Sequence, residues 1–130
     1  VVCHGASYVD ELGYRELFER LAAESATGSR AGWRFRYLPT ISRPLEERNA
    51  QWRGATGRVD RLLARGPHGE PSPLELLLDE PLSPAASFAH VCGFEGTVQD
   101  VEQLLEPLGF RSARRPDPDG SYDFKSESYG

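Results

Sequence analysis

The chain has 130 residues, of which 38% are hydrophobic and 27% are charged, and its formal net charge is −5. This size and balance are typical of one globular domain and exclude a disordered segment. No apolar run approaches the roughly 20 residues that a membrane-spanning helix needs, and the N-terminus has no signal-peptide pattern. The only two cysteines, Cys3 and Cys92, are too few for a disulfide scaffold. We therefore expect a cytoplasmic protein with no membrane partner.

The first predicted elements are a short buried strand over residues 1–3, a turn over 4–7 and a helix over 9–24. Ser7 and Asp10 have the spacing of a capping box, with an acid in place of the usual Glu. One face of the helix is apolar at helical spacing, with Val9, Leu12, Leu17, Phe18, Leu21 and Ala22. Small and polar residues over 25–32 predict a loop.

Alternating aromatic and arginine residues predict the next strand, over residues 33–38. Its arginine-bearing face favours an edge or solvent-facing position, because central parallel strands are apolar on both faces. Pro39 leads out of this strand into a loop that carries Ser42 and Arg43. A short helix is predicted to start within residues 56–59 and to stop at Gly66.

The C-terminal part begins with a Pro- and Gly-rich connection over residues 66–87, interrupted by one apolar turn over 74–78. A strand over 87–92 and a loop over 94–97 follow, and then a helix that Thr97 caps and Gly109 closes. Two more strands are predicted, over 110–113 and 122–125. Alternation of strands and helices along the whole chain predicts the α/β class, with a parallel sheet covered by helices.

Ligands of such sheets bind beyond the carboxyl ends of the strands. This rule places residues 4–7, 39–43, 92–95 and the chain terminus on one rim. The charge along the chain agrees, since residues 30–65 contain nine arginines and three acids, whereas the whole chain carries −5. Arginine presents a planar fork that suits phosphate. We infer an anionic ligand at this rim.

Five short motifs follow one another in a characteristic order. They are His4-Gly-Ala-Ser7 followed by Glu11-Leu12 and Tyr14, then Leu38-Pro-Thr-Ile-Ser42-Arg43-Pro44, then Gly57-Arg58-Val59, then Val91-Cys92-Gly93, and finally Glu127 and Tyr129 near the terminus. In this order the chain resembles the ferredoxin–NADP reductases, most of all their bacterial branch. The resemblance covers nearly the whole chain and lies over the NADP-binding half, a three-layer, Rossmann-like nucleotide-binding domain.

The resemblance implies a set of phosphate ligands. Ser42 and Arg43 match the Ser-Arg pair that holds the adenosine 2′-phosphate in the family, and Arg58 matches a second ligand to the same phosphate. Ser7 is expected to lie against the same nucleotide, although several bacterial members have an Arg near this position. Arg48 or Arg53 would be the replacement. We expect a preference for NADPH that is weaker than in the family at large.

The resemblance also implies a hydride-transfer site. Cys92 and Gly93 match the family's Cys-Gly pair, at which nicotinamide and flavin approach each other. Glu127 matches an acid that takes part in hydride or proton transfer, and Tyr129 matches an aromatic residue that stacks on the flavin. Residues 94–97 depart from the family's usual Asn-Pro-x-Met sequence, so the family's role for this loop is not carried over to them.

The implied cofactors are NADP(H) and an FAD bound mainly by residues outside this chain, and the implied partner is ferredoxin or flavodoxin. The family's first strand, its Gly-rich turn and its FAD-binding barrel have no counterpart in these residues. We therefore expect residues 1–130 to be an N-terminally truncated NADP-binding domain, inactive alone. The missing strand would be central, and its absence would leave two strand edges unpaired.

Three other interpretations were weighed. An NADH-dependent reductase component of an oxygenase would share the fold. Nucleic-acid binding would use the Arg-rich loop with aromatic side chains such as Trp52, but the acidic pI of about 5.2 and the single lysine argue against it. A metal site of Cys3, His4, His90 and Cys92 is disfavoured because adjacent residues of a strand point to opposite faces, so no metal is expected.

Overall fold

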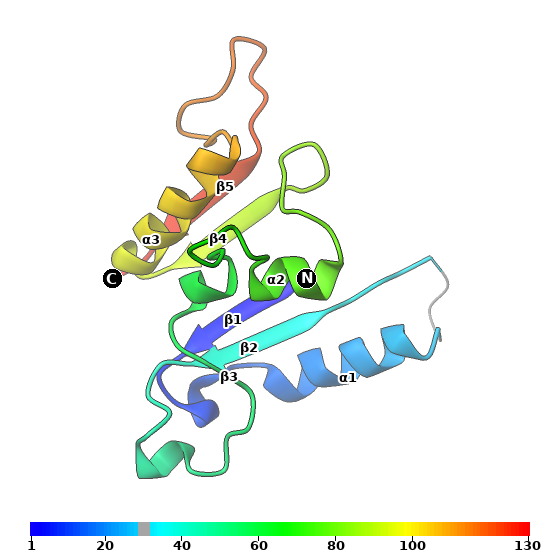
Figure 1. Cartoon of the computed structure of the whole chain (residues 1–130), viewed down its shortest axis with the longest axis vertical. Coiled ribbons are helices and arrows are strands. Elements are labelled where there is room, and N and C mark those ends of the chain that lie inside the picture. The colour runs from blue at the N-terminus through cyan, green and yellow to red at the C-terminus, as the bar shows by residue number, and fades with distance from the viewer. Residues whose placement is uncertain (29–31) are drawn as a thin grey trace. The chain divides into compact units, whose positions relative to one another are not determined.

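A computed structural model of the chain describes residues 1–28 and 32–130 (Figure 1). These residues form two compact units, Val1–Val59 and Asp60–Gly130. Part of the predicted 25–32 loop, with Arg30, lies outside the described residues.

The first unit contains a small parallel sheet with the order β1-β2-β3. Its strands are β1 (Val2–Ala6), β2 (Tyr37–Ile41) and β3 (Ala55–Thr56), and Val2 is in register with Tyr37. The helix α1 (Arg15–Ala26) connects β1 to β2, as a crossover between parallel strands requires. Two 3-10 turns, η1 (Val9–Glu11) and η2 (Glu47–Asn49), follow β1 and β2.

An aromatic cluster packs α1 against the segment that leads into β2. The Phe18 ring centroid lies 5.2 Å from that of Tyr37 and 6.0 Å from that of Phe35. Trp33 stacks on Phe35 at 5.7 Å and 11°. Every second residue of this segment therefore meets α1 or its aromatic neighbour. The strand predicted over 33–38 nevertheless begins only at Tyr37, and β2 is the middle strand of the sheet and not an edge strand.

Several boundaries predicted in this unit are wrong. β1 continues to Ala6, into the turn predicted over 4–7. The helix predicted over 9–24 is broken, since Gly13 follows η1 and Tyr14 takes a left-handed conformation with φ 60° before α1 begins. Ser7 caps neither segment; the residue before η1 is Tyr8, without a side-chain cap. Pro39 does not end the strand but lies within β2, opposite His4. It is accommodated because β3 pairs with β2 only from Thr40 onward.

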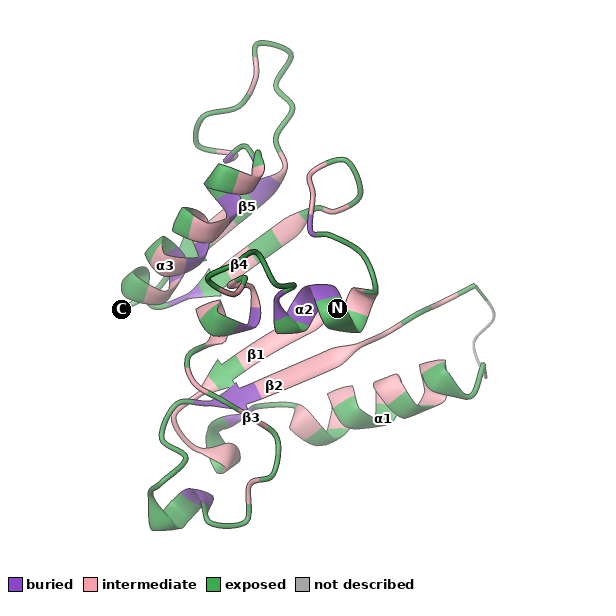
Figure 2. Cartoon of the chain, viewed as in Figure 1, coloured by how far each residue is buried: buried purple, intermediate pink, exposed green. Residues whose placement is uncertain are grey.

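The second unit contains a two-stranded parallel sheet of β4 (Ala89–Gly93) and β5 (Phe124–Ser128). The helix α3 (Glu95–Leu105) follows β4 and contacts both strands, and the 3-10 turn η4 (Glu106–Leu108) ends at Gly109, which has φ 93° as predicted for a helix stop. The buried side chains of α3 and of the strand–loop segments form the core, namely Val98, Val101, Leu105, Phe110 and Phe124 (Figure 2).

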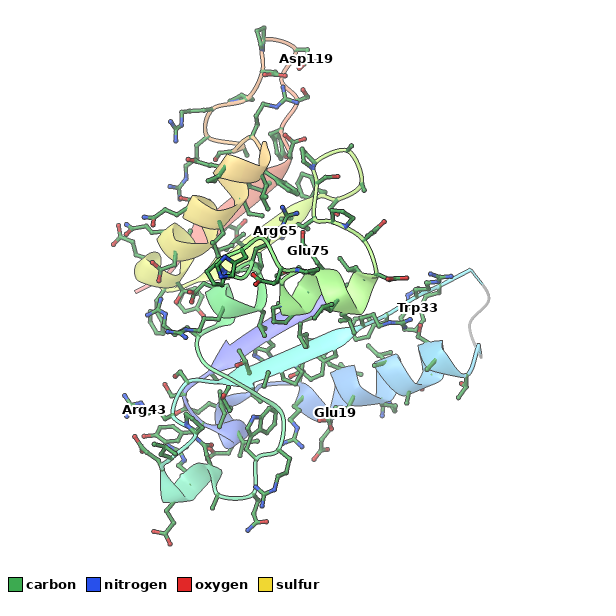
Figure 3. All side chains as sticks on the ribbon, viewed as in Figure 1. Glu19, Trp33, Arg43, Arg65, Glu75 and Asp119 are labelled. Carbon is green, nitrogen blue, oxygen red and sulfur yellow. The ribbon has the colours of Figure 1, made fainter. Side chains whose placement is uncertain are left out.

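A capping box starts the helix α2 (Pro73–Leu78), the apolar turn predicted in the Pro-rich connection. The Ser72 hydroxyl accepts the backbone N–H of Glu75, and the Glu75 carboxylate accepts the N–H of Ser72. Before it, η3 (Val59–Leu62) is a 3-10 turn that buries Leu62 and is shorter than the predicted helix, which was to stop at Gly66. Arg65 and Glu75 point toward each other (Figure 3), with an Nη2–Oε1 distance of 2.5 Å.

Three further predictions in this unit are wrong. Residues 110–113 form no strand, only an isolated bridge between Ser112 and Phe124. Thr97 does not cap α3, which begins two residues earlier after Phe94. The last strand lies over Phe124–Ser128 and not over 122–125, so Glu127 is a strand residue.

The α/β class with parallel strands is therefore confirmed, while the strands of the described residues form two small sheets and not one. None of the described helices is long and apolar enough to cross a membrane.

Candidate functional site

Three predicted phosphate-binding segments meet at one edge of the β1-β2-β3 sheet. Ser42 directly follows β2, and its N–H donates to the Ala6 carbonyl at the end of β1 at 2.9 Å. The N–H of Gly57 donates to the Ile41 carbonyl at 2.8 Å, so Arg58 follows the end of β3 at the same edge. Ser7, Ser42, Arg43 and Arg58 thus follow the carboxyl ends of three neighbouring strands.

The closeness of these segments depends on Gly5. A Cβ on Gly5 would lie 2.8 Å from the Cβ of Val59, a separation that packed atoms do not adopt. Because Gly5 has no side chain, the start of η3, and with it Arg58, can approach β1.

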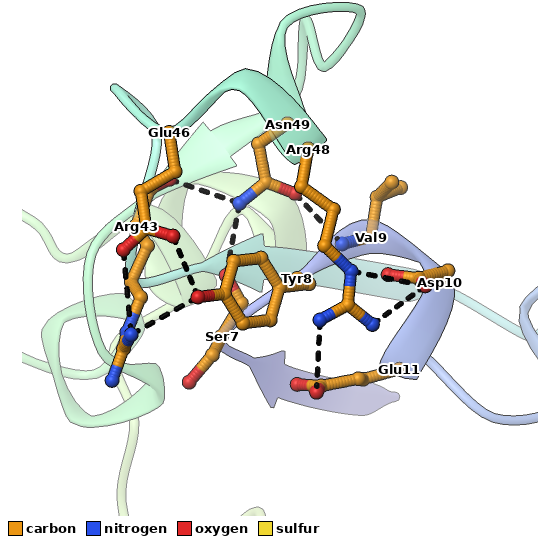
Figure 4. A network of polar contacts seen from close by, with 9 residues as sticks. All are labelled: Ser7, Tyr8, Val9, Asp10, Glu11, Arg43, Glu46, Arg48 and Asn49. Carbon is orange, nitrogen blue, oxygen red and sulfur yellow. Dashed lines mark hydrogen bonds and ion pairs between the residues drawn. The ribbon is translucent and has the colours of Figure 1, made fainter.

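Arg43 is held by two neighbours in this structure (Figure 4). Its Nη1 donates to the Tyr8 hydroxyl at 3.0 Å and to the Glu46 carboxylate at 3.3 Å. The Tyr8 hydroxyl donates to the second oxygen of Glu46 at 2.6 Å. This hydrogen bond from Tyr8 is the largest cause that lowers the pKa of Glu46, so the carboxylate is ionised near neutral pH.

Arg48 and Arg53 also have partners. Arg48 pairs with Asp10 at 2.6 Å and with Glu11 at 3.7 Å, and its guanidinium lies 4.1 Å from the centroid of the Tyr8 ring. Arg53 donates to the carbonyls of Ala50 and Trp52, both at 2.8 Å. The positive charge predicted from residues 30–65 is thus partly offset by acids that precede this segment in the sequence.

Asn49 is a site residue that sequence reasoning missed. Its side chain is buried and accepts the Val9 N–H at 2.9 Å. It also donates to the Ser7 carbonyl at 3.0 Å and to the Arg43 carbonyl at 2.9 Å. Asn49 therefore ties the loop after β1 to the loop after β2, and a single Asn within an Arg-rich segment gave no signal of this role.

The remaining predicted residues meet at the corresponding edge of the β4–β5 sheet. Cys92 is in register with Glu127, and the Tyr129 N–H donates to the Gly93 carbonyl at 3.1 Å. The Tyr129 ring lies 5.2 Å from the Phe94 ring, and the two residues are 58% and 63% exposed. The terminus is therefore anchored beside Gly93, and two accessible aromatic rings lie next to the Cys-Gly pair.

Glu127 is an acidic residue at this edge of the β4–β5 sheet, called the second edge below. Lys125 lies 3.0 Å from its carboxylate and the His90 Nε2 lies 3.7 Å from it. The hydrogen bond from Lys125 is the largest cause that lowers the pKa of Glu127. Alternation along the strands places these side chains and Cys92, which is exposed, on one face of the sheet.

The Cys3 side chain is less exposed than that of Cys92. Burial raises the pKa of the Cys3 thiol to about 11, so it stays protonated at neutral pH. Among residues 1–28 and 32–130, no group of three or more His, Cys, Asp or Glu side chains is placed to hold a metal ion.

No protein-family model matches the chain, and no curated protein matches it. Among solved structures, it is similar to a ferredoxin NADP+ reductase from Neisseria gonorrhoeae with bound FAD and NADP. The TM-score is 0.62 and the sequence identity is 25%, over 96% of this chain and 42% of that chain. The chain therefore spans less than half the length of this neighbour. The resemblance to the bacterial ferredoxin–NADP reductases, over a length that fits their C-terminal half, is confirmed.

Proposed function

We propose that residues 1–130 are the NADP-binding domain of a cytoplasmic, FAD-dependent oxidoreductase that passes electrons between NADPH and ferredoxin or flavodoxin. The observation that carries this proposal is the gathering of Ser42, Arg43 and Arg58 at the carboxyl edge of three parallel strands, where nucleotides bind in α/β sheets. The likeness in fold to a reductase solved with FAD and NADP supports it. The finer fold that we propose for the complete domain is the three-layer, Rossmann-like arrangement that the resemblance implies.

The residues that follow the carboxyl ends of β1, β2 and β3, called the first edge below, fit the 2′-phosphate of NADPH. Arg43 and Arg58 are exposed cations on adjacent loops, and Ser42 adds an exposed hydroxyl. A dianionic phosphate is well matched by two guanidinium groups and a hydroxyl, because each offers charge-assisted hydrogen bonds. Ser7, at the end of β1, would lie against the adenosine.

The residues at the second edge fit the ring end of the cofactors. When bound, FAD would supply the redox chemistry, accepting a hydride from NADPH and releasing the two electrons singly to the carrier protein. Cys92 and Gly93 would leave room for the nicotinamide, since a thiol is small and Gly has no side chain. Tyr129 would cover the flavin until nicotinamide displaces it. Glu127, held ionised by Lys125, would accept hydrogen bonds near the reacting rings.

The decisive experiment compares binding of 2′,5′-ADP and 5′-AMP to the full-length protein, measured by calorimetry or NMR shifts. We expect 2′,5′-ADP to bind at least about tenfold tighter, and Arg43→Ala to remove this difference by weakening 2′,5′-ADP about 10- to 100-fold. Arg20→Ala is the matched control, because Arg20 is an exposed arginine of α1, away from the loops that follow the strands.

Equal binding of the two nucleotides by a folded protein would contradict the NADPH assignment. It would favour the NADH-dependent reductase of an oxygenase system, the alternative that shares the fold.

A further inference from the structure

At the first edge, the Arg43 guanidinium and the Tyr8 hydroxyl form a small anion-binding position, called the seat below. The Glu46 carboxylate occupies it. One oxygen accepts the Tyr8 hydroxyl at 2.6 Å, and the other lies 3.3 Å from Arg43 Nη1. Arg43 also donates to the Tyr8 hydroxyl at 3.0 Å, so the three side chains close a triangle (Figure 4). A guanidinium and a phenol hydroxyl therefore converge on one carboxylate.

Neighbouring side chains hold Tyr8, one of the two donors to the Glu46 carboxylate. Arg48 lies over the Tyr8 ring and is itself paired with Asp10, while Asn49 fixes the backbone on both sides of Tyr8. The Arg43 and Glu46 side chains are 54% and 49% exposed. The Glu46 backbone is bonded to the Arg43 carbonyl at 3.2 Å, so its carboxylate can leave the seat by side-chain rotation alone.

The chemistry of the seat is not specific for a carboxylate. A phosphate group offers more acceptor oxygens and about twice the charge, and it suits guanidinium and hydroxyl donors equally well. An ionised Glu46 beside Arg43 both occupies the donors and repels a second anion. A phosphate that takes both the Arg43 Nη1 and the Tyr8 hydroxyl as donors must displace the Glu46 carboxylate.

We propose that Glu46 is an internal competitor for the phosphate of the nucleotide, and that displacing it turns the Tyr8 hydroxyl into an additional phosphate ligand. This inference rests on the proposed function, since it assigns the phosphate group to Arg43. It names a specificity-determining residue: Glu46 lowers affinity only for nucleotides with a phosphate at this seat.

The test is binding of 2′,5′-ADP and 5′-AMP to full-length wild type and Glu46→Gln, at an ionic strength near 0.15 M, where remote charges are screened over about 8 Å. Releasing an exposed ion pair predicts that Glu46→Gln binds 2′,5′-ADP about two- to fivefold tighter and 5′-AMP unchanged within about twofold. The gain should vanish in the Arg43→Ala background. Tyr8→Phe should weaken 2′,5′-ADP about two- to tenfold.

Glu47→Gln is the matched control, since it removes the same charge from the next residue, which is exposed and has no bond to Tyr8 or Arg43 among the described residues. Glu46→Gln binding no tighter than Glu47→Gln, in a protein whose wild type prefers 2′,5′-ADP and loses that preference in Arg43→Ala, would overturn the role of Glu46 and leave the proposed function standing. Equal binding of both nucleotides by wild type would overturn both.

Discussion

The Glu75 carboxylate lies almost fully buried, with 4% of the residue exposed, yet its pKa is lowered to about 2. Its two oxygens accept hydrogen bonds from Arg65 and from the backbone N–H groups of Ser72 and Leu82. The bonds from Arg65 are the largest cause of the lowered pKa, and they outweigh the desolvation that opposes them. This one side chain joins the start of α2 to the chain on both sides of it.

Glu75→Gln is expected to reduce the free energy of unfolding by about 1–3 kcal/mol, because it leaves buried donors without their acceptors. Since the folded-state pKa lies below the usual 4.5, the carboxylate contributes its full stabilisation above pH 4.5 and loses it as the pH falls through about 2. Chemical denaturation at several pH values measures both effects. Glu80→Gln, at an exposed residue beyond α2, is the control. A stability difference between wild type and Glu75→Gln that stayed constant from pH 6 to pH 2 would contradict this explanation.

At the scale of secondary-structure elements, β1 and η3 are in contact through Gly5 and Val59. Gly5→Ala is expected to destabilise the protein by about 1–3 kcal/mol, because a Cβ 2.8 Å from that of Val59 forces one element to move. The displacement would carry Arg58 with it and weaken 2′,5′-ADP binding.

Gly13→Ala is the matched control for Gly5→Ala, since no atom lies within 4 Å of a Cβ built there. Thermal unfolding and nucleotide titration of both variants measure the effect. Equal stability of Gly5→Ala and Gly13→Ala would show that this contact does not matter. Val59→Gly should recover part of the loss in the Gly5→Ala background.

The sequence predictions were more accurate for features that depend on neighbouring residues than for features that depend on distant parts of the chain. Apolar periodicity predicted α1 and α3, and the Gly109 stop was confirmed, because these depend on neighbouring residues. Pro39 was misjudged since its place in β2 depends on where β3 begins, which lies far along the chain. The strand over 110–113 failed because its apolar residue Phe110 is buried without strand pairing.

The candidate site was predictable as a set of strand ends but not as a network. Motif order identified Ser42, Arg43 and Arg58, and the parallel sheet confirms that they follow adjacent strands. The bonds of Arg43 to Tyr8 and of Arg48 to Asp10 were not predictable, because these partners lie more than thirty residues away in the sequence. The roles in catalysis of Cys92, Glu127 and Tyr129 stay predictions.

At the scale of the whole molecule, the uneven charge along the sequence is less uneven in space. The chain carries −5, and the arginines after β2 are paired with Glu46, Asp10 and Glu11. A nucleic-acid surface needs many cations available to phosphates at once. In this structure Arg43 and Arg48 are instead paired with acidic side chains.

We therefore expect no binding of a single-stranded oligonucleotide at about 0.15 M salt, where non-specific complexes already need micromolar or higher concentrations. Fluorescence anisotropy of a labelled thymidine oligonucleotide, titrated with protein from low to high salt, measures this. Submicromolar binding at that salt, with a steep decline at higher salt, would instead support the nucleic-acid alternative.

The two cysteines differ enough to be treated as separate chemical groups. Cys3 lies within β1, and with a pKa of about 11 only roughly one thiol in ten thousand is ionised at pH 7. Cys92 is exposed beside Gly93, on the face that carries Glu127. Within residues 1–130, a thiol-directed dye would therefore attach at Cys92 in preference to Cys3. The natural sequence thus provides an attachment site for an optical reporter beside the edge at which electron transfer is proposed.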